Sequence, residues 1–556
     1  MNPEIFRCKK NENAHCYRFP WKNFVHLLKD HSNRRRDHPA IVFRNLDRDV
    51  REVTTYKQLE EKTSRIAGTL HYKFGVGPGD TVALCLPNCP EVSLVTLALL
   101  RLGATSVPLD PKRDVPERKR YKLTDSGAKL LCVLPEDVNT ESEIVKDTQI
   151  VDTEELLSGE FGASPDLEPE WCGNFDLEQA TCIVLYTSGT TGHPKGALLT
   201  RQSITSNADG IARWLGFDAS ERLNLVLPFH HVNSTVFSFT IFMLGATVVL
   251  NSRYSAGKFW SIVSEERATA GSIVPTIMKD LVSRWEEFRT LTPDISSLRK
   301  VMIGSAPVPA GAACKFYELY GIRLVQGYGT TEVSLRVTGV PHDLPEEDYL
   351  KALSENAAGV ELANCNVKIE GDLPQGELGE ILVRGPVVSA GYLNLPEETD
   401  EVFDKGWFRT GDIGFWRALG GRKFFFVHGR RKEILIKGGV NISPIAVENA
   451  LTEAIPELAA AYVVGLDDAR WGEDICAAVV FKNGLSAADQ TTAAEDLLSS
   501  GRTGNIPGLS AYESPAKIIP FQTDQLPMTS TGKVQRGKLR GIVERMIQSE
   551  DLETSK

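Results

Sequence analysis

The sequence lacks the features of a secreted, membrane-spanning or zinc-dependent protein. Its ten cysteines include no CxxC pair and no histidine spacing suited to zinc, so we expect reduced, mostly buried thiols, as in a cytoplasmic protein. There is no uncharged apolar run of about 18 residues, and we therefore expect no membrane span. The first residues also lack the apolar core of a signal peptide.

Basic charge is scarce as well. The chain has 62 Lys and Arg against 73 Asp and Glu, a net charge of −11, and its basic residues form no run longer than three, as at 34–36 and 430–432. Charge therefore gives no indication of a nucleic-acid partner. The 42% hydrophobic and 24% charged content is ordinary for a globular protein, and 556 residues are too many for one small core. We expect two or more domains.

Strand-like apolar runs alternate with helix-like periodicity along the first half of the chain. This alternation favours an α/β fold with parallel sheets. We predict helices at 54–74, 90–102, 203–215 and from 444 onward, and strands at 40–43, 82–86, 103–109, 129–134, 182–186, 197–199, 223–228, 245–250, 270–275, 301–303, 424–427, 460–466 and 475–481. Residues 156–178, rich in Gly, Pro and Glu, predict a surface loop.

One loop carries the clearest chemical signal. Residues 186–196 read Tyr-Thr-Ser-Gly-Thr-Thr-Gly-His-Pro-Lys-Gly between two apolar runs. Glycines let backbone N–H groups approach an anion, the hydroxyls add donors, and Lys195 adds a positive charge. The loop predicts a phosphate cradle. It is not a Walker A loop, because Gly196 rather than Ser or Thr follows Lys195.

This loop resembles the signature of the adenylate-forming superfamily, which comprises acyl-CoA synthetases, carrier-loading adenylation domains and luciferases. Further segments resemble the superfamily's other motifs, in the same order, over about residues 50–540. The resemblance implies a large N-terminal α/β domain of mainly parallel sheets with a β-barrel-like part at 1–429. It also implies a small mobile α+β domain at 430–556, with a hinge at Lys432.

The resemblance assigns most of the site residues to ATP. Glu332 is implied to bind Mg²⁺, Thr331 to contact the α-phosphate, Tyr328 to stack on adenine, and Asp412 and Arg430 to contact ribose. The implied cofactor-binding residues are Thr187, Ser188, Gly189, Thr190, Thr191, Gly192, Lys195, Gly304, Ser305, Ala306, Pro307, Gly327, Tyr328, Gly329, Thr330, Asp412, Arg430, Lys432, Gly438 and Gly439.

Three further assignments concern the reaction itself. His231 matches a histidine at the acyl tunnel, although His230 stands where the superfamily usually has Phe. Lys533, in a Pro-x-Thr-x-x-Gly-Lys-like segment, matches the lysine that reaches the substrate carboxylate and α-phosphate. The turn at Gly438 and Gly439 matches the one that lines the pantetheine tunnel. Lys533, Thr331, Glu332 and His231 are therefore the implied catalytic residues.

The implied function is an ATP-dependent, AMP-forming acid–CoA ligase that uses ATP, Mg²⁺ and coenzyme A. No acidic residue occurs in 233–239, which disfavours an amino-acid substrate. Gly329, in place of a pocket-closing Trp, predicts open space for a medium- or long-chain, aromatic or other bulky acid. Asn233, Ser234 and Thr235 can also bond a polar acyl tail. Two alternatives stay open: transfer to a carrier protein, and a non-catalytic nucleotide-binding protein. The oligomeric state is not predicted.

Overall fold

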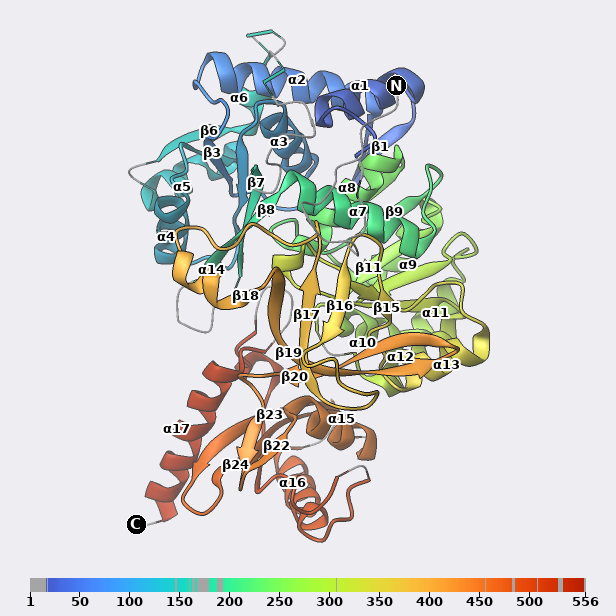
Figure 1. The fold of residues 1–556 in the computed structure, drawn as a ribbon, viewed down its shortest axis with the longest axis vertical. Helices are drawn as coiled ribbons and strands as arrows, with labels where there is room; N and C mark the ends of the chain where they lie inside the picture. The colour runs from blue at the N-terminus through green and yellow to red at the C-terminus, as the bar shows by residue number, and fades with distance from the viewer. Residues whose placement is uncertain are drawn as a thin grey trace.

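The computed structural model describes residues 17, 19–145, 148–159, 161–162, 166–167, 180–187, 194–306, 308–455, 457–482, 486–507, 509–528 and 534–554. Four β-sheets organise these residues. Two sheets flanked by helices build the N-terminal part, a third antiparallel sheet lies below them, and the C-terminal sheet forms the far end of the molecule (Figure 1).

The first sheet has six strands in the order β6-β5-β3-β4-β7-β8. Neighbouring strands run parallel except for the β7–β8 hairpin. The strands are β3 Thr81–Leu84, β4 Thr105–Pro108, β5 Leu130–Val133, β6 Gln149–Asp152, β7 Thr181–Thr187 and β8 Lys195–Thr200. The helices of this region are α1 Phe24–Arg34, α2 Tyr56–Tyr72, α3 Pro90–Arg101, α4 Pro116–Ser126, η1 Pro135–Asp137, α5 Val138–Ile144 and α6 Thr153–Leu157.

The second sheet has nine strands in the order β15-β14-β13-β12-β11-β9-β10-β1-β2. The six central strands are parallel, and antiparallel strands close both edges. The strands are β1 Pro39–Asn45, β2 Val50–Thr55, β9 Arg222–Leu225, β10 Thr247–Asn251, β11 Ala270–Ile273, β12 Lys300–Ile303, β13 Arg323–Tyr328, β14 Thr338–Gly339 and β15 Val360–Glu361.

Helices cover both faces of this second sheet. Because side chains alternate along a strand, Met302 and Val325 pack in one apolar cluster with α7 and α8, whereas Val301 and Ile303 pack with α9, α10 and α12. The helices are α7 Arg201–Leu215, α8 Val232–Leu244, α9 Ala256–Glu265, α10 Pro275–Ser283, α11 Trp285–Leu291, α12 Ala310–Tyr320, η2 Thr331–Val333 and α13 Glu346–Ser354.

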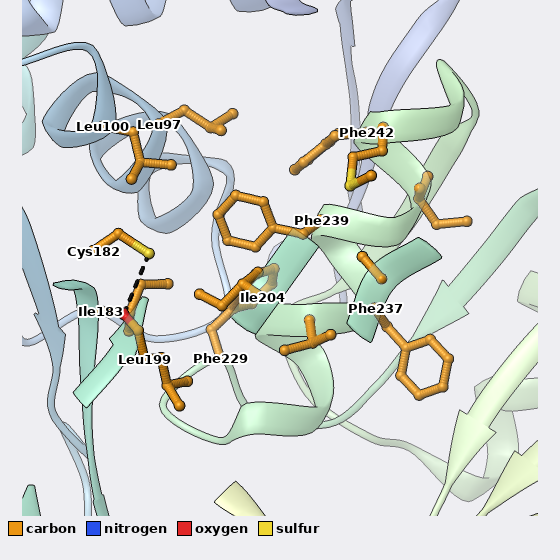
Figure 2. Packing of buried hydrophobic residues seen from close by; sticks show 14 of the residues in the cluster. Leu97, Leu100, Cys182, Ile183, Leu199, Ile204, Phe229, Phe237, Phe239 and Phe242 are labelled. Atoms are coloured by element: carbon orange, nitrogen blue, oxygen red, sulfur yellow. Dashed lines mark hydrogen bonds between the residues drawn. The ribbon is translucent and has the colours of Figure 1, made fainter. Parts of the chain in front are cut away.

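The two sheets share a core where α3, β7 and α8 meet. Figure 2 shows Leu97, Ile183 and Phe239 turned toward one another there, with the Cys182 thiol donating to the Leu199 carbonyl at 3.5 Å. A cavity of about 20 Å³ remains between these elements, bordered by Phe229 and Phe239 among others. It has room for about one water molecule.

The third sheet is antiparallel, in the order β16-β17-β19-β18 with β20 paired to β19. Its elements are β16 Asn366–Ile369, β17 Gly379–Arg384, α14 Pro396–Val402, β18 Phe403–Asp404, β19 Trp407–Leu419 and β20 Arg422–Arg430. A bridge between Gly359 and Phe425 joins β20 to the second sheet. Asp412 of β19 and Arg430 at the end of β20 lie beside Tyr328 at the end of β13, where the nucleotide motifs lie.

The C-terminal part has its own sheet, β22-β21-β24-β23 with β25 beside β24. Its elements are β21 Leu435–Lys437, β22 Val440–Ile442, α15 Pro444–Ala454, β23 Leu458–Asp468, β24 Gly472–Phe481, α16 Ala487–Arg502, β25 Lys517–Pro520, η3 Thr523–Gln525 and α17 Arg536–Thr554. Two apolar clusters belong to it alone. Links to the rest include Ser443 Oγ donating to the His428 carbonyl at 2.5 Å and Lys279 Nζ donating to the Ala459 carbonyl at 3.0 Å.

The predicted fold class is confirmed: the chain is α/β, with parallel sheets in a large N-terminal part and a smaller C-terminal part. The helix predicted from 444 onward is also confirmed: α15 begins at Pro444 and is capped by Ser443. The predicted strand 223–228 ends earlier, at Leu225. Among the described residues, no helix is long and apolar enough to cross a membrane.

Candidate active site

The β7–β8 hairpin carries the predicted phosphate loop. Thr187 and Lys195 are register partners at its tip, and Thr187 Oγ1 donates to the Lys195 carbonyl at 3.3 Å. The loop residues Ser188, Gly189, Thr190, Thr191 and Gly192 lie outside the described residues. The hairpin therefore fixes both ends of the loop. Lys195 Nζ lies 5.3 Å from the centre of the Tyr392 ring.

Tyr392 connects this lysine to Glu332. Its hydroxyl donates to Glu332 Oε1 at 2.9 Å, while Glu332 itself sits in the short helix η2 just after β13. Burial and the adjacent carboxylate both raise the pKa of the Tyr392 hydroxyl, so it stays a proton donor. Sequence reasoning missed Tyr392, because no motif pointed to it.

A short segment that contains Tyr392 connects the β7–β8 hairpin to η2. Residues 390–393 run along the outer edge of β8, where Leu198 N donates to Gly391 O at 2.9 Å and Leu393 N donates to Gly196 O at 2.8 Å. Ser389 N donates to the backbone carbonyl of Glu332 at 2.8 Å. We call residues 389–393 the strap, because it ties the hairpin to the turn that carries Glu332.

The second group of predicted residues lies where β13, β19 and β20 meet. The Tyr328 hydroxyl donates to Asp412 Oδ2 at 2.7 Å, and Arg430 Nε lies 3.4 Å from Asp412 Oδ1. Asp412 and Arg430 are register partners on β19 and β20. Burial, reinforced by the Asp412 charge, raises the pKa of the Tyr328 hydroxyl.

Arg430 links the two groups electrostatically. Burial alone lowers the pKa of its guanidinium, but Asp412, Glu433, Glu332 and Tyr328 raise it, and the net shift is upward. The positive charge of Arg430 therefore interacts with the carboxylates of both Asp412 and Glu332. The predicted residues of the hairpin, of η2 and of the third sheet thus face one common region.

Close backbone approach explains the glycines of this region and corrects one expectation. A side chain on Gly329 would collide with the carbonyl oxygen of Leu335. The backbone of Leu335 and Arg336 therefore fills the space beside Gly329. The prediction that Gly329 leaves this space open for a bulky acid is wrong. A Cβ on Gly304 would similarly lie 2.6 Å from the guanidinium of Arg336. The assignment of Gly304, Ser305 and Ala306 to the nucleotide stays a prediction, and Pro307 lies outside the described residues.

His231 occupies the N-cap of α8, at the start of the helix that packs on the second sheet. Burial, with smaller contributions from His230 and other cations, lowers the pKa of its imidazole to about 3. The ring is therefore neutral at physiological pH. His230 Nε2 lies 3.2 Å from Asp110 Oδ2, so the residue that departs from the superfamily pattern forms an ion pair when protonated.

The C-terminal candidates are far less enclosed. Lys432 is exposed on the connection between β20 and β21. Gly438 and Gly439 form the β21–β22 turn with φ of 53° and 85°, which L side chains rarely adopt. Ile436 and Val440 flank that turn with 54% and 49% exposure. Lys533 lies outside the described residues.

Comparison with known proteins identifies the family. The model of the AMP-binding enzyme family matches residues 28–393, and the model of the AMP-binding enzyme C-terminal domain matches 446–533. The chain belongs to this family, and with it to the CoA-ligase members of the adenylate-forming superfamily.

Relatives and solved structures agree with this assignment. A feruloyl-CoA synthase of Amycolatopsis is 35% identical over 87% of this chain and 93% of its own. The long-chain-fatty-acid–CoA ligase FadD13 of Mycobacterium tuberculosis is 32% identical over 88% of this chain and 93% of its own. The o-succinylbenzoate CoA synthetase of Bacillus subtilis, solved with its acyl-adenylate, superposes with a TM-score of 0.77 at 28% identity, over 92% of this chain and 97% of its own.

The residues present fit a magnesium ion. The Tyr392 hydroxyl donates to Glu332 Oε1, and no hydrogen bond between the described residues engages the other carboxylate oxygen. Mg²⁺ is usually held by one or two carboxylates together with phosphate oxygens and water. Glu332, oriented by Tyr392, would supply the one carboxylate of that donor set. Bound there, the ion would neutralise charge on the phosphate oxygens of ATP.

Proposed function

We propose that this AMP-binding enzyme is an ATP-dependent acid–CoA ligase that releases AMP and pyrophosphate. Its feruloyl-CoA synthase and long-chain-fatty-acid–CoA ligase relatives support an acid larger than acetate. The observation that carries the proposal is the chain of contacts from Lys195 through Tyr392 to Glu332, with Arg430 and Asp412 beside it. These contacts support a single nucleotide site built from two sequence motifs and the third sheet.

Adenylation is the first half of the reaction. A carboxylate oxygen of the acid attacks the α-phosphorus of ATP, and the bond to pyrophosphate breaks. We assign the β- and γ-phosphates to the loop between Thr187 and Lys195, the α-phosphate to Thr331 and Lys533, and the ribose hydroxyls to Asp412 with Arg430. Charge grows on phosphate oxygens in this step, so preoriented donors lower its barrier most.

Thioester formation is the second half. The CoA sulfur attacks the acyl carbon, the bond to AMP breaks, and the thiol proton leaves to solvent. We assign the pantetheine channel to Gly438 and Gly439, which are exposed here, and the pivot to Lys432 on the connection between domains 1–429 and 430–556. In this arrangement the C-terminal domain turns so that Lys533 withdraws as the glycine turn enters.

The neutral state of His231 suits the acyl end of the site. An imidazole whose pKa is about 3 places no positive charge beside the acid and can still donate or accept one hydrogen bond. We therefore assign His231 to orienting the acid at the start of α8. The absence of an acidic side chain in 233–239 argues against an amino-acid substrate.

The decisive experiment is a panel of carboxylic acids assayed for AMP release with and without CoA. We expect AMP release to depend on ATP, Mg²⁺, CoA and one class of acid, and pyrophosphate exchange to occur without CoA. AMP release that requires a carrier protein in place of CoA would support the carrier-loading alternative. No pyrophosphate exchange with any acid would contradict both enzyme assignments and leave a nucleotide-binding protein.

A further inference from the structure

Arg336 is a fully buried cation that has no acidic partner in the described part of the chain. Its side chain is 1% exposed, and among the described residues Nε and Nη2 have no hydrogen-bond partner. Burial alone accounts for the lowered pKa of about 10, which leaves the guanidinium charged at neutral pH. A buried, unpaired charge is costly to keep, so a group that compensates it is expected.

The backbone around Arg336 is built to hold this side chain in place. Asn207 of α7 brackets the residue: its Nδ2 donates to Arg336 O at 2.6 Å, and its Oδ1 accepts from Arg336 N at 3.3 Å. Just before it, Ser334 and Leu335 have backbone φ angles of 58° and 123°, which are unfavourable for residues other than glycine. Strain of this kind persists where the surrounding structure fixes a functional position.

Two glycines make room for the guanidinium at the ends of adjacent strands. A Cβ on Gly304 would lie 2.6 Å from Arg336 Nη2, and one on Gly327 would lie 3.0 Å from Arg336 Cδ. Gly304 lies two positions after Met302, and Gly327 lies two positions after Val325, so each glycine is on the same face of its strand as that apolar residue. Both glycines therefore face the side of the sheet that α7 and α8 cover.

A second unpartnered donor lies on that same face. Asn233, at the start of α8, is 3% exposed; its Oδ1 accepts from Ser272 Oγ at 2.9 Å, but its Nδ2 has no partner among the described residues. Ser272 is the register partner of Met302, so its side chain points to the α8 face too. Arg336 and Asn233 thus lie on the same side of the second sheet, each with a buried donor that has no partner among the described residues.

We propose that Arg336, assisted by Asn233, binds a second carboxylate of the acid substrate, so that the enzyme prefers dicarboxylic acids. This inference rests on the proposed function, which assigns His231 and Thr331 to the reacting end of the acid. The distal carboxylate would accept from Nε and Nη2, and such charge-assisted bonds are about twice as strong as neutral ones.

The test compares dicarboxylates of four to eight carbons with their monoamides, which differ only in the charge of the distal group. We expect the wild-type kcat/KM to favour at least one dicarboxylate over its monoamide by about tenfold or more. Arg336→Met should remove that ratio, and Arg336→Lys should retain part of it. Asn233→Ala should reduce the ratio less than Arg336→Met does.

Four outcomes would count against the inference. A wild-type enzyme that uses monoamides as well as dicarboxylates, one that activates only monocarboxylic acids, or one whose ratio survives Arg336→Met would overturn it while leaving the ligase assignment intact. A chain that activates no acid at all would overturn both. Because the wild-type ratio is measured without any mutation, a variant that fails to fold does not remove the test.

Stability supplies an independent readout. Removal of an uncompensated charge should raise the urea midpoint of Arg336→Met above the wild-type value. Arg101→Met is the matched control: Arg101 is 2% exposed but lies 3.1 Å from Glu60 and 3.5 Å from Asp166, so its loss should lower the midpoint. A lower midpoint for Arg336→Met, as for the control, would indicate that Arg336 has a structural role only.

Discussion

At the scale of single residues, the site depends on a tyrosine that the motifs do not contain. Tyr392 bonds one oxygen of Glu332 and lies under Lys195, so it orients the proposed magnesium ligand and separates it from the lysine. It belongs to no glycine-rich turn and stands 60 residues from Glu332 in the sequence. Only the folded strap brings it there, which is why the sequence did not reveal it.

Replacing Tyr392 with Phe should therefore weaken the use of Mg²⁺. Loss of a hydrogen bond to a charged group costs about 1.5–3 kcal/mol, so we expect pyrophosphate exchange to fall about tenfold or more at limiting Mg²⁺. Magnesium titrations of both enzymes measure the effect. Tyr254→Phe is the control, because Tyr254 donates to Asp280 at 2.8 Å outside the site. Equal losses in the two variants would argue against a specific role.

His231 leads to a prediction about pH. Burial lowers its folded-state pKa to about 3, below the value of about 6.5 in an unfolded chain. The unfolded state then binds more protons at acidic pH, so the contribution of this residue to stability is present above pH 6.5 and is lost as the pH falls toward 3. We expect His231→Gln to show a flatter decline in unfolding free energy between pH 7 and pH 4 than the wild type. Parallel declines would contradict the assignment.

At the scale of secondary structure, the glycine turn after β13 lies where the motif predicts it, but its glycine is needed for a different reason from the predicted one. The motif at 327–332 was predicted to hold the nucleotide, and Tyr328 and Glu332 do lie beside the other candidates. Gly329, however, was expected to leave the acyl pocket open. Glycine is instead required because a side chain at this position would collide with the carbonyl of Leu335. Only the turn at η2 brings these two residues together.

Gly329→Ala should consequently disturb the turn itself. The added methyl group would displace Leu335 and with it the segment that carries Thr331 and Glu332, so we expect loss of adenylation together with a lower melting temperature. Gly311→Ala is the matched control: Gly311 lies in α12 with no atom near its missing Cβ, so alanine there should be neutral or slightly stabilising. An active, stable Gly329→Ala enzyme would contradict this prediction, because it would show that the turn accommodates a methyl group.

The elements themselves were predictable where apolar periodicity is strong. The helix expected at 54–74 is α2, with a Thr55 capping box, and the strand expected at 301–303 is β12. Short or polar strands were missed: β14 and β15 have two residues each, and β19 alternates apolar with polar and charged residues. Their stability comes from partners distant in sequence, which a local pattern does not contain.

At the scale of the whole molecule, the reaction requires one site to accommodate two sets of residues. Lys533→Ala should cripple adenylate formation yet leave thioester formation from supplied acyl-adenylate nearly unchanged, because the role proposed for the lysine is confined to the first half-reaction. The two half-reactions are measured separately, by pyrophosphate exchange and by CoA consumption. Equal loss in both would contradict the assignment of Lys533.

Lys432→Pro tests the pivot from the other direction. Proline fixes φ near −65° and so stiffens the connection between β20 and β21. We expect adenylation to persist and thioester formation to slow, which single-turnover measurements of each step would detect. Lys432→Ala, which removes the charge without the ring, should leave both rates close to wild type. An unchanged thioester rate in the proline variant would place the pivot elsewhere.

The strap has a further consequence for how the chain tolerates shortening. β8 is the last strand of the first sheet, and residues 390–393 cover the backbone groups that its outer edge would otherwise expose. A fragment that stops before residue 389 would leave a bare strand edge, a template for pairing with other copies. Such a fragment should aggregate even though every residue of the first two sheets is present, whereas one that extends through the third sheet should stay dispersed.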